Sequence, residues 1–545
     1  MNDCDEVDLP LGVTCPRGGW THQTVTDRLN QLLAAGATSV TRTTEGFSAE
    51  GRSIESLTLG AGKTRVIAWS QMHGDEHTYT SVVLNLLQML IQAPASPITE
   101  SILDNLSLLV IPLLNPDGAQ RGIRFNAQGV DINRDARDRA TPEGALLHRV
   151  VREFSPGYAF NLHNQSPRRL LPHSPDPIAL SVLVPPVDPQ NSQTPGVLEA
   201  TRVVASVCHA VAGRCGSRLS RYTADYMPRC FGEWAQSQGV ATVLLEAGGS
   251  RHGNIEELER LNFLALLAGL EAIAEPGNAA VDPSIYANLP HALEREAFDL
   301  FVSRPLLICG PGTKPVEADL GVNRPNKSAM PPCPGLGRIE DIGDLREYTG
   351  LATINAQGML CLPGGIGIAE PPGVPDSVAL ERLQEEALGR GQTTLLVIVD
   401  GSSQAVRDGI RQVTKGPAPL IHVGFVACRA SEASVGLGAD WLLGALDNAD
   451  PSIMSDTLSV EDFLSHTKDF ASRFGLQEFH AIGRGELANL VLTPNTGDLQ
   501  GLLPRPNAVA VDGTLVLSDG AIVQRHAGAW LRRASRAEAG PKSKA

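Results

Sequence analysis

The stretch NPDGAQRGIRFNAQGVDINRD (residues 115–135) holds a dense cluster of polar groups. It directly follows the apolar run LSLLVIPLLN (106–115), which has the length and composition of a buried strand. In sheets built from buried strands and covered by helices, the residues that bind ligands lie just beyond the carboxyl ends of the strands. The polar residues of 115–135 are therefore candidates for a functional site.

The chain around this stretch alternates extended and helical patterns. Apolar runs at 65–72, 157–164 and 240–249 are typical of buried strands, and each ends in polar or glycine residues. Segments 22–35 and 80–93 place apolar side chains at helical spacing. Strands separated by helices predict an α/β fold with a mixed, mostly parallel sheet that helices cover on both faces.

Two further polar sites follow predicted strands. MHGDEH (72–77) supplies His73 and Glu76, whose side chains can bind one metal ion from the same side of a turn. FNLHN (160–164) supplies His163 at the end of another strand. Two histidines and one glutamate with an open fourth position form a recognised catalytic zinc arrangement. The HxxE pair alone is also compatible with a helix-capping cluster.

The motifs HGDE, NPDG, RFNAQGVDINRD, NLH and a strand ending in LLE occur in this order between residues 20 and 275. In these motifs and in their order, the sequence resembles the M14 zinc carboxypeptidases. The resemblance implies a catalytic domain over residues 1–277, in which His73, Glu76 and His163 bind one Zn²⁺.

The resemblance also implies roles for residues of the 115–135 stretch. Asp131 would accept the remaining ring N–H of His73 and fix its orientation, although a plain turn residue is the alternative. Asn133 and Arg134 would bind the terminal carboxylate of the substrate, since a guanidinium matches a carboxylate in a bidentate manner.

Arg124 and Glu246 would act on the reacting groups. Arg124 would stabilise the oxyanion at the scissile carbonyl, unless the neighbouring Arg121 is the functional arginine. Glu246 would be the general base that takes a proton from zinc-activated water and returns it to the leaving amine. It follows apolar residues at the end of a buried strand, where a carboxylate is costly unless it is paired or near a metal. An ion-paired structural role is its alternative.

Some positions depart from the family pattern. Relatives have a mobile tyrosine that caps the substrate; here Tyr222 and Tyr226 both qualify, and the spacing favours Tyr226, with a core or surface tyrosine as the alternative. Gly232 stands where relatives line the specificity pocket, and it indicates no preference for charge or size. Arg168 and Arg169 either favour an acidic side chain in the substrate or belong to a solvated or carboxylate-paired turn.

Composition narrows the class of protein. The chain has 545 residues, which favours two or three domains, and 45 basic against 60 acidic side chains give a net charge of −15. This charge repels phosphate backbones, so we expect no nucleic-acid partner. No run approaches the roughly 20 apolar residues of a membrane span, so no membrane association is expected. The chain has nine cysteines and no CxxC pair, and its N-terminus is acidic, unlike a secretory signal. These two features predict a cytoplasmic protein.

The second half of the chain has a different sequence pattern. We expect a linker over 278–295 and an accessory region over 296–545. Within this region, β-sandwich strands at 296–365 and 485–533 would flank a truncated α/β part at 376–480. The pieces resemble amidohydrolases of the dihydroorotase and D-aminoacylase kind.

This second half lacks the residues of a hydrolase site. Where those relatives place a metal-binding HxH, the chain has Ala369 and Pro371, which cannot ligate a metal. The region is therefore expected to shape the peptidase cleft, to mediate self-association as a homo-oligomer or to bind a ligand.

Taken together, the sequence predicts a zinc-dependent metallocarboxypeptidase that hydrolyses the amide bond before the C-terminal residue of a peptide or an N-acyl amino acid. The alternative is a zinc-dependent amidase or deacylase acting on a non-peptide or cell-wall amide. Asn133 and Arg134 favour a substrate with a free carboxylate in either case. A binding or scaffold protein would require one of the chemical positions to be missing, and none is.

Overall fold

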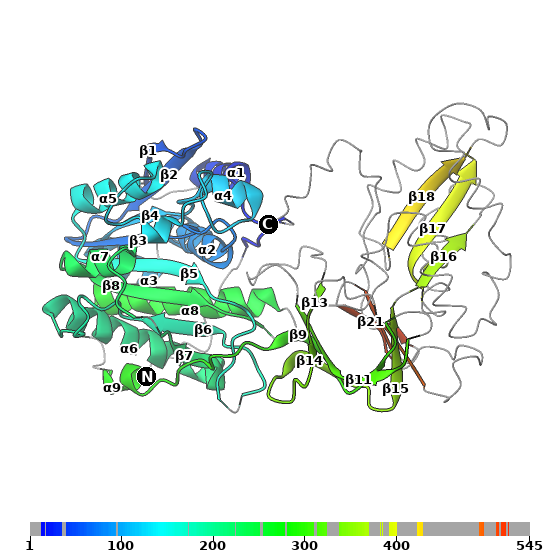
Figure 1. Cartoon of the computed structure of the whole chain (residues 1–545). Coiled ribbons are helices and arrows are strands. Elements are labelled where there is room, and N and C mark those ends of the chain that lie inside the picture. Colours follow the sequence, from blue (N-terminus) through cyan, green and yellow to red (C-terminus); the bar gives the residue numbers. More distant parts are fainter. Residues whose placement is uncertain are drawn as a thin grey trace. The chain divides into compact units, whose positions relative to one another are not determined.

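The computed structural model divides into two compact units, the first ending at Ala297 and the second beginning at Phe298 (Figure 1). The described residues are 12–16, 18–34, 40–93, 96–172, 174–223, 225–250, 254–277, 281–309, 313–323, 337–363, 365–369, 382, 384, 392–400, 422–428, 490–494, 508–511, 514–518 and 521–522.

An eight-stranded sheet forms the centre of the first unit. Its order is β1 (Val40–Phe47), β2 (Ser53–Leu59), β4 (Leu106–Ile111), β3 (Thr64–Trp69), β5 (Tyr158–Asn164), β8 (Ala241–Ala247), β6 (Leu180–Leu183) and β7 (Leu219–Arg221). The four central strands β4, β3, β5 and β8 run parallel to one another. The strands β1, β2 and β6 are joined to the sheet by antiparallel pairings. The mixed sheet predicted from the sequence is confirmed, and its parallel strands direct their carboxyl ends to one edge.

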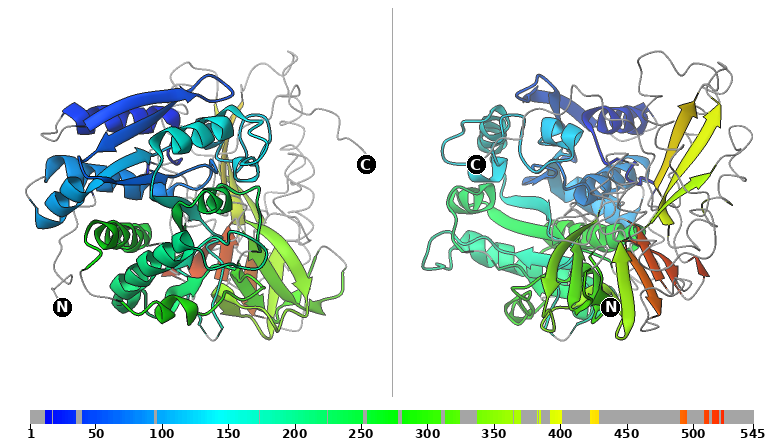
Figure 2. Two further views of the ribbon diagram at one scale, coloured as in Figure 1. Left: turned by 90° about the vertical axis from the view of Figure 1, so that its left-hand side faces the viewer. Right: turned by 45° about the vertical axis from the view of Figure 1, so that its right-hand side comes forward.

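Helices cover both faces of this sheet (Figures 1 and 2). One face packs against α1 (His22–Ala34), α2 (Thr78–Gln92), α3 (Pro97–Asn105), α6 (Pro195–Cys215) and α8 (Ile255–Ala274). The other packs against α5 (Pro142–Phe154) and α7 (Phe231–Ser237). Side chains alternate between the two faces of each strand, so Val66 and Ala68 of β3 enter the first core, and Ile67 and Trp69 enter the second.

The segment expected to be a linker instead packs within the first unit where it is described. It contains α9 (Ser284–Ala287), in which Tyr286 is buried and its hydroxyl accepts a hydrogen bond from the Val184 N–H at 3.0 Å. The Leu293 N–H donates to the Leu170 carbonyl at 2.9 Å. A buried aromatic ring and backbone pairing therefore hold residues that the Pro- and Asn-rich composition had suggested were free.

The described residues of the second unit form three sheets. A four-stranded sheet joins β9 (Phe298–Ser303), β12 (Asp319–Asn323), β13 (Arg338–Gly343) and β14 (Gly350–Asn355). A seven-stranded sheet joins β10 (Leu306–Leu307), β11 (Val316–Glu317), β15 (Met359–Pro363), β19 (Leu490–Pro494), β20 (Ala508–Val511), β21 (Thr514–Ser518) and β22 (Ala521–Ile522). The third sheet is parallel and joins β16 (Gly365–Ala369), β17 (Gln392–Asp400) and β18 (His422–Cys428).

Strands therefore occur in both segments where the sequence predicted them, and β15 pairs with β19 across more than a hundred residues of chain. Of the truncated α/β part predicted at 376–480, only residues 382, 384, 392–400 and 422–428 are among the described residues. The resemblance of this unit to amidohydrolases stays a prediction.

Within the described residues, no single helix combines the length and apolar character of a membrane span; only the bent pair of α2 and α3, taken together, reaches both.

Candidate metal centre and active site

Three buried side chains converge at the carboxyl ends of β3 and β5. His73 and Glu76 lie in the turn after β3, and His163 lies in β5. One ligand atom from each lies within 4.8 Å of the others. The Nδ1 atoms of His73 and His163 lie 2.7 and 2.8 Å from the two carboxylate oxygens of Glu76.

Glycine makes the local fold of this group possible. A Cβ at Gly74 would lie 2.0 Å from the backbone carbonyl carbon of Gly118, in α4 (Pro116–Arg121), so the HGDE turn and the NPDG turn touch through their backbones. Asn115 joins the two turns, because its side-chain amide donates to the Met72 carbonyl at 3.2 Å and its oxygen accepts from the Gly118 N–H at 2.9 Å. The two motifs thus position His73 as one rigid piece.

Asp131 lies where the sequence analysis expected it. Its Oδ1 accepts from His73 Nε2 at 3.1 Å and also from the Asn133 N–H at 2.9 Å, at the start of the short helix η2 (Ile132–Arg134). The two alternatives for this residue therefore coexist, since one carboxylate caps a turn and orients the imidazole.

Arg124 lies beside the three converging side chains, and Arg121 does not. The Nε and Nη2 atoms of Arg124 donate to Asp131 Oδ2 at 3.0 and 2.9 Å, and its Nη1 lies 3.2 Å from His73 Nδ1. Arg121 instead forms an exposed ion pair with Glu50. Because Arg124 uses Nε and Nη2 to bind Asp131, its third nitrogen, Nη1, faces the metal donors.

Glu76 and the two imidazoles shift one another's pKa values. Burial would lower the pKa of His73, but the charge of Glu76 and the hydrogen bonds that the imidazole donates to Asp131 and Glu76 raise it to about 9. Burial opposes ionisation of Glu76, yet the two imidazoles hold the pKa of its carboxyl below its ordinary value. Two imidazole nitrogens and a carboxylate that face one point are the donor set of catalytic zinc sites, so these residues fit a zinc ion.

Glu246 ends β8 directly beside His163. The Cα atoms of the two residues are register partners in the parallel pairing of β5 and β8. The Glu246 side chain is 7% exposed and has no hydrogen bond or ion pair within the described part of the chain. Burial, followed by the negative charge of Glu76, raises the pKa of its carboxyl to about 8. A structural ion pair therefore does not explain this carboxylate.

Asn133 and Arg134 lie beside the three metal donors, on the side of α7. The side-chain oxygen of Asn133 accepts from the Phe231 N–H at 3.0 Å, which turns its amide nitrogen to within 3.4 Å of His163 Nε2. Arg134 Nη1 donates to the Asn133 carbonyl at 2.7 Å, and no described carboxylate forms an ion pair with its guanidinium. Both side chains can therefore receive an anion next to the metal donors.

Of the two candidate tyrosines, Tyr222 is the one with a described electrostatic link to Glu246. The negative charge of Glu246 is the largest cause that raises the pKa of the Tyr222 phenol, ahead of its burial. Its N–H donates to the Val182 carbonyl at 2.9 Å, which ties the residue to the edge strand β6. No described contact joins Tyr226 to these side chains. The spacing that favoured Tyr226 does not account for this backbone pairing.

Sequence reasoning missed the residues that hold the 115–135 loop in shape. Asn126 accepts from the Val130 N–H at 3.0 Å and donates to Glu143 Oε2 at 3.1 Å. Asp135 accepts from the N–H and the hydroxyl of Thr141 at 2.8 and 2.7 Å. Thr141 followed by proline is a helix-start signal that could have predicted the second anchor.

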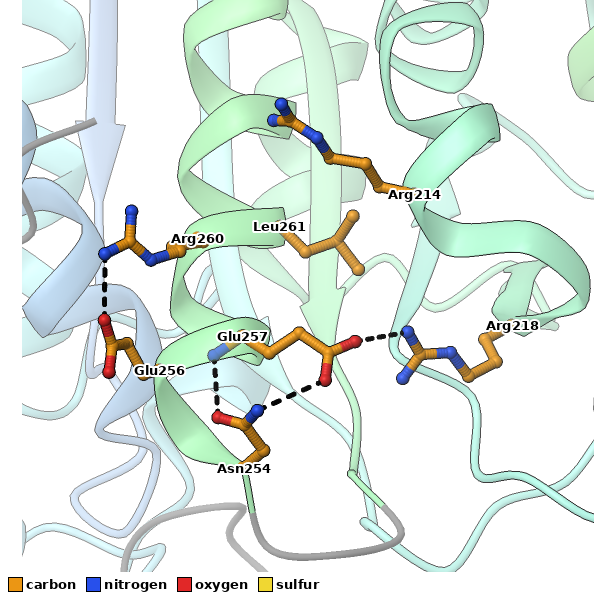
Figure 3. Close-up of a pocket in the computed structure, with 7 residues that line it drawn as sticks. All are labelled: Arg214, Arg218, Asn254, Glu256, Glu257, Arg260 and Leu261. Atoms are coloured by element: carbon orange, nitrogen blue, oxygen red, sulfur yellow. Dashed lines mark hydrogen bonds and ion pairs between the residues drawn. The ribbon is translucent and has the colours of Figure 1, made fainter. Parts of the chain in front are cut away.

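A separate surface pocket of about 510 Å³ lies between the end of α6 and the start of α8 (Figure 3). Arg218 pairs there with Glu257 at 2.7 Å, and Arg260 pairs with Glu256 at 2.8 Å. Because opposite charges compensate within the pocket, we assign it no function.

The chain was compared with protein families, with curated proteins and with solved structures. Residues 25–161 match the family model of the zinc carboxypeptidases, peptidase family M14. No curated protein matches the chain.

Several solved structures are similar in part. One is a metallo-carboxypeptidase from Burkholderia cenocepacia, with 21% identity over 47% of this chain and 70% of that chain and a TM-score of 0.39. Another is carboxypeptidase A from Helicoverpa armigera, with 17% identity over 50% of this chain and 79% of that chain and a TM-score of 0.40.

The matched segment includes His73 and Glu76 and ends two residues before His163. The match over residues 25–161 to the zinc carboxypeptidase (M14) family model and the His73–Glu76–His163 group are consistent with each other, since these residues form a group like the M14 zinc site.

Proposed function

We propose that the protein is a zinc-dependent metallocarboxypeptidase that hydrolyses the amide bond before the C-terminal residue of a peptide or an N-acyl amino acid. The observation that supports this most strongly is the convergence of His73, Glu76 and His163 on one point, with Glu246 as the strand neighbour of His163.

Each side chain has a distinct task in this proposal. His73 and His163 would hold the zinc ion through Nδ1, and Glu76 through its carboxylate. Bound zinc supplies Lewis acidity, which activates a water and polarises the amide carbonyl. Glu246 accepts the proton of the attacking water and delivers it to the leaving amine nitrogen. A pKa raised toward neutral pH suits a group that must accept a proton and then return it.

The basic residues around the group determine what is cleaved. Arg124 donates from Nη1 to the amide oxygen as negative charge develops there. Arg134 and Asn133 bind the terminal carboxylate, which restricts cleavage to the last residue of the substrate. The Tyr222 hydroxyl, on the side of Glu246, is a further donor to the bound substrate.

The test compares purified, zinc-loaded protein on peptides with free and with amidated C-termini, with products identified by mass spectrometry. We expect loss of single C-terminal residues from the free peptides only. Glu246→Gln should keep zinc and lose activity by about 10³-fold. Equal cleavage of amidated peptides would favour the amidase alternative, and a zinc-loaded protein that cleaves neither class would overturn the proposal.

A further inference from the structure

Two consecutive arginines follow β5, and the structure separates their roles. Arg168 is buried, its Nη2 lies 3.5 Å from Glu296, and its carbonyl accepts from the Ala297 N–H at 2.9 Å. Arg169 is half-buried, and its guanidinium forms no hydrogen bond or ion pair within the described part of the chain. Its one described side-chain contact is with the ring of Tyr222, whose centroid lies 5.2 Å from the guanidinium carbon.

Backbone hydrogen bonds fix Arg169 next to the end of β8. The Gln165 N–H, in the same turn, donates at 2.8 Å to the carbonyl of Ala247, the residue after Glu246. The Ile178 N–H donates to the Arg169 carbonyl at 2.9 Å, and the Gly249 N–H donates to the Ile178 carbonyl at 2.8 Å. The turn that carries Arg169 is therefore attached to the strand that carries Glu246.

No described hydrogen bond uses the N–H donors of the Arg169 guanidinium, which lies over the ring of Tyr222. Tyr222 contacts Arg169 through its ring, an arrangement that holds a cation by its face. The N–H donors of a guanidinium lie in its plane and match a carboxylate in a bidentate manner. The charge of Arg169 acts on Glu246, but no described carboxylate forms an ion pair with its guanidinium, so an incoming anion can be bound there. Arg134 already serves the terminal carboxylate, which leaves Arg169 for a second one.

We infer that Arg169 binds a second carboxylate of the substrate, so that the enzyme prefers acidic peptides or acidic N-acyl amino acids. This inference rests on the proposed function. The second carboxylate can belong to the side chain of the C-terminal residue or to that of the residue before it, and the chemistry of recognition is the same.

The test measures kcat/KM for two pairs of peptides, one with Glu or Gln at the C-terminus and one with Glu or Gln at the penultimate position. The variants are Arg169→Gln, Arg169→Lys and, as a matched control, Arg221→Gln. Arg221 also stacks on a tyrosine, with its guanidinium carbon 4.7 Å from the ring centroid of Tyr286. The control therefore removes the same kind of contact without removing Arg169.

We expect the wild-type protein to prefer Glu over Gln by about tenfold or more at one of the two positions. Arg169→Gln should abolish this ratio, Arg169→Lys should keep part of it, and Arg221→Gln should keep all of it. The inference is overturned if the wild-type protein shows no preference at either position. It is also overturned if Arg169→Gln lowers kcat/KM equally for all four peptides, since the residue would then act on Glu246 and not on substrate.

A binding measurement separates this inference from the proposed function. Calorimetric titration of the inactive Glu246→Gln protein with N-acetyl-Glu-Glu and N-acetyl-Gln-Gln requires no turnover and covers both positions. We expect this protein to bind N-acetyl-Glu-Glu at least tenfold more tightly than N-acetyl-Gln-Gln, and its Arg169→Gln derivative to bind both alike. A zinc-loaded wild-type protein that cleaves no peptide would refute the proposed function, whereas equal binding of the two compounds to Glu246→Gln would refute the role of Arg169.

Discussion

Gly74 and Gly118 touch through their backbones, and a Cβ built on Gly74 would lie 2.0 Å from the Gly118 carbonyl carbon. This contact joins the turn that carries His73 and Glu76 to the loop that carries Arg124 and Asp131. The position of the metal donors relative to the basic residues therefore depends on a glycine that ligates nothing.

Gly74→Ala should lower both zinc affinity and stability, because the obstructing atoms are backbone and cannot rotate away. We expect a loss of about 1–3 kcal/mol in the free energy of unfolding, together with reduced zinc content after dialysis. Gly213→Ala is the matched control, since a Cβ there meets no atom within 4 Å. Full zinc content and unchanged stability in Gly74→Ala would show that the two turns can separate without consequence.

Asp117 of the NPDG motif should matter for stability and not for chemistry. Its side chain is 0% exposed and accepts from Ser48 Oγ at 2.8 Å, from the Glu50 N–H at 2.9 Å and from Arg52 Nη1 at 2.6 Å. Asp117→Asn replaces one acceptor oxygen by a donor that faces other donors, so it should cost about 1–3 kcal/mol.

Chemical denaturation measures this loss as a lower midpoint at an unchanged denaturant dependence. The exposed Asp27→Asn is the control and should stay within about 0.5 kcal/mol of the wild type. An Asp117→Asn midpoint equal to that of the control would show that these contacts contribute nothing.

Glu259 in α8 should make stability fall as pH rises. It is 1% exposed, and burial raises the pKa of its carboxyl to about 7. The folded protein therefore keeps a proton that the unfolded chain releases above its lower pKa, and stability decreases between about pH 4.5 and pH 7. A rise of this size in pKa corresponds to roughly 3 kcal/mol.

Glu259→Gln removes this ionisation, so at pH 8 the variant should be more stable than wild type, with a flatter pH dependence. Melting temperatures between pH 5 and pH 8 measure the difference, and the exposed Glu256→Gln is the control. If Glu259→Gln and wild type lose stability in parallel over this range, the buried carboxyl is not the cause.

Tyr222 and Tyr226 can be separated by removing one hydroxyl at a time. Tyr222→Phe should lower kcat/KM about tenfold, because its phenol lies within the electrostatic reach of Glu246. Tyr226→Phe should change it by less than twofold. A larger loss of kcat/KM in Tyr226→Phe than in Tyr222→Phe would support Tyr226, the residue that sequence spacing favoured.

The main elements of the first unit could be predicted from sequence because apolar spacing alone identifies them. The runs at 157–164 and 240–249 became β5 and β8, with ends shifted by one or two residues. Asp131 and Arg124 were found because they lie within one compact motif whose spacing leaves little freedom.

Features that depend on packing between distant segments were beyond the sequence. The backbone pairing of Tyr222 with Val182 ties this tyrosine to the edge strand β6, and no local pattern encodes it. Composition likewise suggested a linker where Tyr286 is buried. Sequence alone could not predict which of the two consecutive arginines has an ion-pair partner. The structure shows that Glu296 pairs with Arg168 and that no described carboxylate pairs with Arg169.

The central claim is that His73, Glu76 and His163 bind one zinc ion, and metal analysis after equilibrium dialysis tests it most directly. We predict about one zinc per wild-type chain and per chain of the control His209→Ala, which removes an exposed histidine. His163→Ala should lose at least 10²-fold in zinc affinity. Equal zinc affinity in His163→Ala and wild type would contradict the account.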